Sequence, residues 1–158
     1  MVQSILQRAL LDLSFKRCIE DNKSKLLSEA KTFGLCFLGD GATVKKLPLV
    51  NVLGSTANIP PVVLEIHDCH AHMASGGRKD APYISSIFFD HLEELDPNKN
   101  LTDVLFFDGA KNVQKAGEII EAKYPRVTCL HGAEHCISLF FDDISKLKQI
   151  KVSTGIFV

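Results

Sequence analysis

Two spacings of apolar residues alternate along this chain and together predict an α/β fold. Short apolar runs predict five strands, over residues 33–40, 47–53, 62–67, 103–107 and 126–130. Helical spacing predicts a helical segment over residues 4–31 in two pieces, and helices over 81–95, 110–123 and 133–147. The run from Val104 to Phe107 has no polar alternation, which is typical of a strand buried on both faces.

The lengths of the connections set the expected order of the sheet. The first three strands are joined by short links, which force antiparallel pairing, whereas the last two each follow a helical crossover and should be parallel. This is the element order of the ribonuclease H-like fold: a mixed five-stranded sheet flanked by helices. In that fold the first and fourth strands are neighbours. The apolar stripe expected on the last helix consists of Ala133, Cys136, Ile137, Phe140, Ile144 and Leu147.

Two of the predicted strands end in an aspartate, Asp40 and Asp108. If these strands are neighbours, the two carboxylates project side by side from one edge of the sheet, where open α/β sheets bind ligands. Two close carboxylates repel each other unless they share a proton or a cation, and hard oxygen ligands suit Mg²⁺ or Mn²⁺. The alternative for Asp108 is a helix N-cap, because a helix begins directly after it.

Composition narrows the class of protein. The chain has 158 residues, 46% of them hydrophobic, which predicts one domain with a real core. The formal net charge of −1 gives no overall basic footprint for nucleic acid. No apolar run approaches the ~20 residues that span a bilayer, so no membrane partner is expected. Five cysteines, an odd number, favour reduced thiols in the nucleus or cytoplasm.

Four short motifs, in order, resemble the catalytic core of hAT-superfamily transposases of the DUF659 subgroup. The motifs are Gly39-Asp40-Gly41-Ala42-Thr43, Asp108-Gly109-Ala110-Lys111-Asn112, Lys123-Tyr124-Pro125 and Gly132-Ala133-Glu134-His135-Cys136. The resemblance covers about residues 33–147. It divides the chain into an N-terminal helical segment (1–32) that packs on the core, a transposase-type domain (33–147) and a divergent tail (148–158).

The resemblance implies a DNA-cleaving and strand-transfer core in which Asp40 and Asp108 hold Mg²⁺ or Mn²⁺. Two such ions would activate the attacking oxygen and stabilise the leaving one. His135 matches a family position near the active site, and DNA is the implied partner. A homodimer or another protein partner is a further expectation. Binding of a partner by the N-terminal helices is the alternative to their packing on the sheet.

The departures from the family pattern predict a truncated or domesticated core that is inactive alone. The family uses a third acidic residue, a Glu that follows a large helical insertion, and residues 148–158 do not resemble that continuation. Glu134 is the preferred substitute, ahead of Asp142 and Asp143. A non-catalytic domain that binds protein or DNA is the alternative function. A small doubly wound enzyme acting on a phosphorylated metabolite is a third interpretation, against which the antiparallel strands argue.

Three other groups of polar side chains have both a possible binding role and a simpler structural interpretation. A zinc or copper site is one interpretation of a His- and Cys-rich stretch, but a solvated loop is favoured. That stretch contains His67, Asp68, Cys69, His70 and His72. A second thiolate–imidazole site would use Cys129, His131, His135 and Cys136, although Cys136 better fits the core. The cations Arg78, Lys79, Lys146, Lys148 and Lys151 are interpreted as solvated surface.

Overall fold

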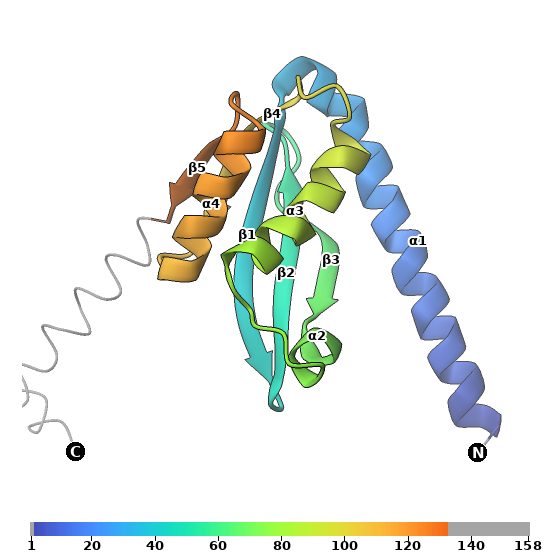
Figure 1. Ribbon diagram of the computed structural model, residues 1–158. Helices are drawn as coiled ribbons and strands as arrows, with labels where there is room; N and C mark the ends of the chain where they lie inside the picture. Colours follow the sequence, from blue (N-terminus) through green and yellow to red (C-terminus); the bar gives the residue numbers. More distant parts are fainter. Residues whose placement is uncertain (1, 133–158) are drawn as a thin grey trace, which may run out of the picture.

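The protein is an α/β domain built on a five-stranded mixed sheet (Figure 1). The computed structural model describes residues 2–132, and side chains from residue 9 onward. The strands are β1 (Leu35–Val44), β2 (Leu47–Ser55), β3 (Val62–Asp68), β4 (Thr102–Phe107) and β5 (Thr128–His131), in the order β3-β2-β1-β4-β5. The first three strands are antiparallel, and β4 and β5 are parallel to β1, as the connection lengths predicted.

The three long helices pack on the same face of this sheet. They are α1 (Val2–Phe33), α3 (Ala81–Leu95) and α4 (Lys111–Lys123). A Cβ atom added to Gly54 would meet Leu26 of α1, one added to Gly39 would meet Phe88 of α3, and Cys129 lies against Gly117 of α4. The main core therefore forms between this face and the helices. Its largest fully buried side chains include Phe37, Phe88, Leu92, Leu105 and Ile120.

Helix α1 corrects the expectation of two helical pieces that cover the core. It is one continuous helix. Asn22 and Lys23, in its middle, contact the rest of the domain. Asn22 Nδ2 donates to the Val63 carbonyl, and Lys23 Nζ lies 2.7 Å from Glu94 Oε1. The buried side chains among its described residues, Ile19, Leu26 and Ala30, all lie in its C-terminal half. Leu10 and Leu13 are 57% and 66% exposed, and the N-terminal half projects away from the sheet (Figure 1).

Two further segments differ from the prediction. Strand β1 does not end at Asp40 but continues to Val44, and a two-residue turn at Lys45 and Lys46 leads into β2. Both lysines have positive φ, 50° and 68°, which is the backbone conformation of a tight two-residue hairpin turn. The stretch predicted as a loop contains a short helix, α2 (His70–Ala74). None of the described helices has the length and apolar character to cross a membrane.

Candidate functional site

The pairing of β1 with β4 brings Asp40 and Asp108 to neighbouring positions. The last paired residues of these parallel strands are Gly39 and Phe107, so the two aspartates are the next residues on adjacent chains. Asp40 also lies opposite Asn51 of β2, because β1 continues beyond it. The adjacency predicted from the sequence is therefore present, although Asp40 lies within a strand rather than at its end.

Both aspartates line one cavity of about 160 Å³. Side chains alternate across a strand, and Cβ atoms on Gly39 and Gly41 would point toward Phe88 and Lys79, on the helix side. Asp40, between them, therefore projects from the opposite side of the sheet. It is exposed, whereas Asp108 is half-buried.

Asp108 is held by the turn that leads into α4. Its Oδ1 accepts a hydrogen bond from the Ala110 amide at 3.1 Å, and its carbonyl oxygen accepts one from His131 Nδ1 at 3.1 Å. The residue at the N-cap position of α4 is Ala110, so the interpretation of Asp108 as the N-cap is wrong. Instead, Asp108 satisfies an amide just before the helix, and its carboxylate retains acceptor sites for a cation.

Lys79 also lines this cavity, a position that its sequence context does not predict. Lys79 was interpreted as solvated surface, but it is half-buried and its Nζ donates to the Leu49 carbonyl at 2.9 Å. Asn112 Nδ2 donates to the Lys79 carbonyl at 3.0 Å, which ties the α4 end of the cavity to this segment. Lys79 and Asn112 therefore line the cavity from the helix side, whereas the Asp40 carboxylate projects from the opposite side of the sheet.

The side chains that line the cavity supply only part of the ligand set of a divalent cation. Asp40 and Asp108 supply carboxylate oxygens, the ligands that Mg²⁺ and Mn²⁺ prefer. Among residues 2–132, no group of three or more His, Cys, Asp or Glu side chains is placed to hold a metal ion. The proposed supporting residues Glu134 and His135, and also Cys136, Asp142 and Asp143, lie outside the described residues.

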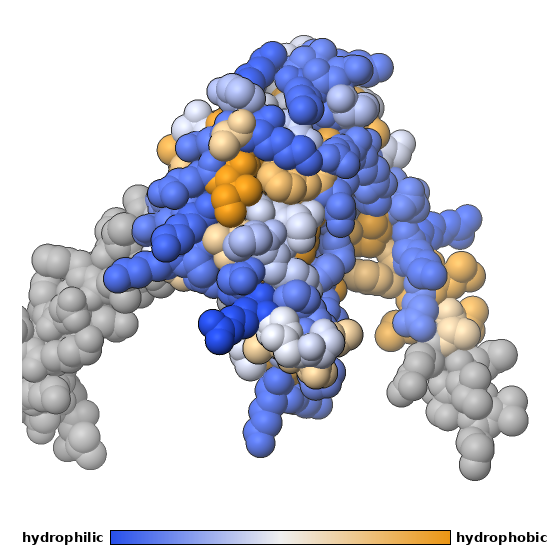
Figure 2. All heavy atoms as spheres, viewed as in Figure 1, coloured by the Kyte–Doolittle hydropathy of each residue, from blue (hydrophilic) through white to orange (hydrophobic). Residues whose placement is uncertain are grey.

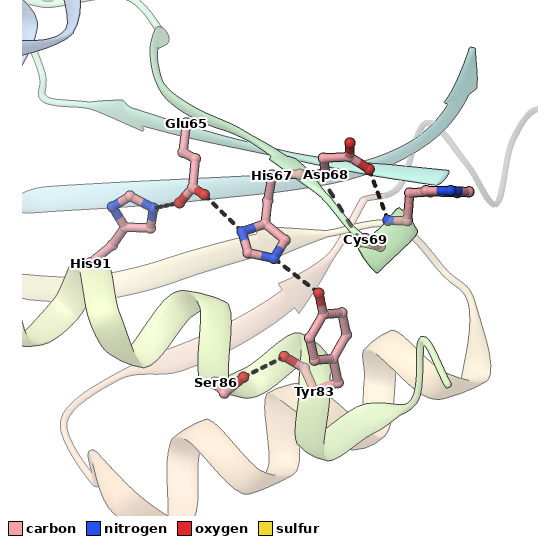
Figure 3. A network of polar contacts seen from close by, with 8 residues as sticks. Glu65, His67, Asp68, Cys69, Tyr83, Ser86 and His91 are labelled. Carbon is pink, nitrogen blue, oxygen red and sulfur yellow. Dashed lines mark hydrogen bonds and ion pairs between the residues drawn. The ribbon is translucent and has the colours of Figure 1, made fainter. Parts of the chain in front are cut away.

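A second group of polar side chains joins β3 to α3 (Figure 3). The Glu65 carboxylate lies 2.7 Å from His91 Nε2 and 2.7 Å from His67 Nδ1, and His67 Nε2 lies 3.0 Å from the Tyr83 hydroxyl. His72 stacks on the Tyr83 ring with 3.7 Å between ring centroids. We call Glu65, His67, Tyr83 and His91 the Glu65 network.

The protons of the Glu65 network follow from its geometry. An ionised carboxylate only accepts, so His91 Nε2 and His67 Nδ1 must both donate to Glu65. In a neutral His67, Nε2 then accepts from the Tyr83 hydroxyl, and burial raises the pKa of that hydroxyl, which keeps it a donor. His91 Nδ1 is buried without a hydrogen-bond partner. The hydrogen bond from His91, with that from His67, lowers the pKa of Glu65 to about 2.

These contacts argue against both proposed transition-metal sites. His67 is engaged by Glu65 and Tyr83, and Cys69 is fully buried. His67 belongs to β3, in agreement with the strand predicted over 62–67, and the expected solvated loop is wrong for Asp68, the last residue of that strand. At the second site, burial, with the nearby Glu121 carboxylate, raises the pKa of the Cys129 thiol to about 12, so the thiolate that binds metal is disfavoured.

Replacing Glu65 with glutamine should weaken the fold in a pH-dependent way. The folded pKa is depressed from 4.5, so the contribution is complete above about pH 5 and is lost as pH falls through about 2. At pH 7 we expect a loss of about 1–2 kcal/mol in the free energy of unfolding, kept small by the 39% exposure of the side chain. Urea unfolding between pH 2 and 7 measures it.

Glu118→Gln, at an exposed position of α4, is the matched control and should change stability little at any pH. A Glu65→Gln difference that stayed constant from pH 7 down to 2 would contradict the assigned charge on Glu65.

Part of each site could be predicted from the amino-acid sequence. Asp40 and Asp108 were found because each follows an apolar run, but Lys79 and Asn112 carry no periodic signal that places them near strand ends. His67 was considered only as a metal ligand. Glu65 was passed over because it occupies an ordinary position in an alternating strand, yet its side chain points to the helix side and meets His91.

No family model matches the chain, and no curated protein matches it.

Proposed function

We propose that this chain is a ribonuclease H-like core derived from a hAT-superfamily transposase of the DUF659 subgroup, domesticated and inactive as a nuclease by itself. The observation that carries the proposal is that Asp40 and Asp108 follow the last pair of β1 and β4 and line one cavity. The pairing of β1 with β4 is the adjacency that this fold and a shared cation both require. DNA is the proposed partner and the nucleus the proposed location, on the resemblance alone.

The two carboxylates would hold one Mg²⁺ or Mn²⁺ ion, which when bound polarises a phosphodiester oxygen or a water molecule. Asp108 is oriented for this role by its hydrogen bond from the Ala110 amide. Lys79 supplies a positive charge in the same cavity, where it would favour a phosphate group and weaken the attraction for a divalent cation. Weak metal binding and an absence of strand cleavage follow from a site that has two acidic residues in place of three.

Calorimetric titration of Mn²⁺ into the full chain tests the metal site. We expect weak binding whose heat is lost in both Asp40→Asn and Asp108→Asn, because each removes one of two charged ligands. The control is Asp103→Asn, an exposed aspartate of β4 that pairs with Arg126 and should leave the titration unchanged. Binding that survives in both site variants, or is absent from the unaltered chain, would overturn the metal site.

Incubation with Mn²⁺ and a labelled DNA duplex tests the predicted inactivity. We expect no nicking above background. Metal-dependent nicking that disappears in Asp40→Asn and Asp108→Asn would show a working nuclease and contradict that part of the proposal.

A non-catalytic interaction domain is the second candidate. It is favoured by large apolar side chains on the N-terminal half of α1, visible as orange atoms in Figure 2, where Leu11 is 72% and Phe15 is 47% exposed. Exposed apolar groups on a projecting helix are typical of a protein-binding surface. Loss of a partner or of self-association in Leu11→Asp, with the Mn²⁺ titration unchanged, would separate this role from the metal site.

A further inference from the structure

The side of the sheet away from the helices carries a continuous apolar row. Leu53 of β2 is paired with Leu38 of β1, Leu38 with Phe106 of β4, and Phe106 with Leu130 of β5. Residues paired across strands point to the same face, and Leu38 lies between Phe37 and Gly39, which face the helices. We call the surface formed by Leu53, Leu38, Phe106 and Leu130, with Cys36 and Val104 beside them, the open face.

No side chain among the described residues buries the open face. Phe106 is 39% and Leu130 42% exposed, whereas Leu105 and Phe107, on the opposite face of β4, are almost completely buried. A hollow of about 410 Å³ borders the row and is lined in part by Cys36, Val104 and Phe106. An apolar face of a sheet is stable only when another element packs on it and removes it from water. The open face therefore needs a second layer.

The chain itself leaves the sheet beside this row. Strand β5 ends at His131, one residue after Leu130, and the Gly132 amide donates to the Phe107 carbonyl at 2.8 Å. The 26 residues from 133 to 158 therefore start at the edge of the open face. Their apolar positions recur with helical spacing, at Ala133, Cys136, Ile137, Phe140, Ile144 and Leu147.

The dimensions of segment and surface agree. A row across four strands is about 14 Å long, since neighbouring strands lie about 4.8 Å apart. A helix of the 15 residues from 133 to 147 would be about 22 Å long and would cross the row with a turn to spare. We propose that residues 133–147 form an amphipathic helix that packs its apolar stripe on the open face and completes the second layer of the domain. This inference does not depend on the metal site.

The thiol of Cys36 reports on this packing in the full-length chain. Cys36 is half-buried on the open face, whereas Cys69 is fully buried elsewhere and Cys18 is exposed on α1. Iodoacetamide labelling followed by peptide mass spectrometry gives a rate for each of these thiols separately. In the unaltered chain, Cys36 should react far more slowly than Cys18.

Phe140→Asp places a charge in the centre of the apolar stripe and should raise the labelling rate of Cys36 by on the order of tenfold, as expected for opening of one local unit. Cys69 should stay slow, which separates local release from global unfolding. Ser138→Asp, off the stripe, is the matched control and should leave Cys36 protected. If Phe140→Asp unfolds the chain and releases Cys69, the milder Phe140→Ala takes its place.

Equal labelling of Cys36 in the unaltered chain and in a folded Phe140 variant would overturn the proposal. So would protection of Cys36 that increases with protein concentration alongside a dimer in size-exclusion chromatography, because a second copy would then cover the open face.

Discussion

Replacing Gly39 with alanine is expected to destabilise the domain by about 2–3 kcal/mol, because the new methyl group has no space. Its Cβ would lie 2.5 Å from Cζ of Phe88 and 2.9 Å from two ring carbons of Phe107. The two rings pack edge to face with 4.9 Å between their centroids, and both side chains are almost completely buried. Neither ring can move without disturbing the core beside Asp40. Chemical denaturation of the two proteins measures the change.

Gly41→Ala is the matched control on the same strand and the same face. There the added Cβ would meet Nζ of Lys79 at 2.9 Å, the end of a flexible side chain that can turn aside. A double-mutant cycle then identifies the obstacle: Phe88→Leu should relieve part of the clash, so Gly39→Ala should cost at least about 1 kcal/mol less in that background. Strictly additive effects would show that Phe88 is not what excludes a side chain at position 39.

The directions of the strands could be predicted because they depend on features that a sequence displays directly. Apolar runs mark the strands, and connection lengths distinguish antiparallel from parallel pairs. The adjacency of Asp40 and Asp108 was expected from the ribonuclease H-like element order, in which the first and fourth strands are neighbours. The continuation of β1 beyond Asp40 could not be seen, because the turn uses Lys45 and Lys46 at positive φ, without the Gly or Asn that usually signals a tight hairpin.

The polar side chains that contact the core were the least predictable. Asn22 and Lys23 looked like a break in the N-terminal helix, yet each binds a partner distant in sequence, on β3 and α3. Lys79 was interpreted as solvated surface, and no role was predicted for Glu65, yet both are half-buried and hydrogen-bonded. Periodicity shows where apolar surface must be buried, but it carries no information about which polar atoms will meet across elements. The candidate site could therefore be placed, while its charge balance could not.

Asp96 should be the acidic residue whose replacement destabilises the fold most, although it does not line the cavity. Only 1% of it is exposed, and its carboxylate accepts three backbone hydrogen bonds, from the amides of Asn100, Leu101 and Thr102 at 2.9, 3.0 and 2.8 Å. These bonds close the connection from α3 into β4, the strand that carries Asp108 at its end.

Replacing Asp96 with alanine would leave three amides without their acceptor and should lower the free energy of unfolding by about 3–4 kcal/mol. Asp96→Asn retains one oxygen and should lose roughly half as much. Asp103→Asn, a few residues further on, is the control: its ion pair with Arg126 is exposed, so the change should be a small fraction of that for Asp96→Ala. Thermal unfolding of the three variants ranks them, and similar losses for Asp96→Ala and Asp103→Asn would show that the backbone amides here find other acceptors. Because β4 enters the sheet through this connection, the stability of the cavity between Asp40 and Asp108 depends on a carboxylate at the opposite end of the strand.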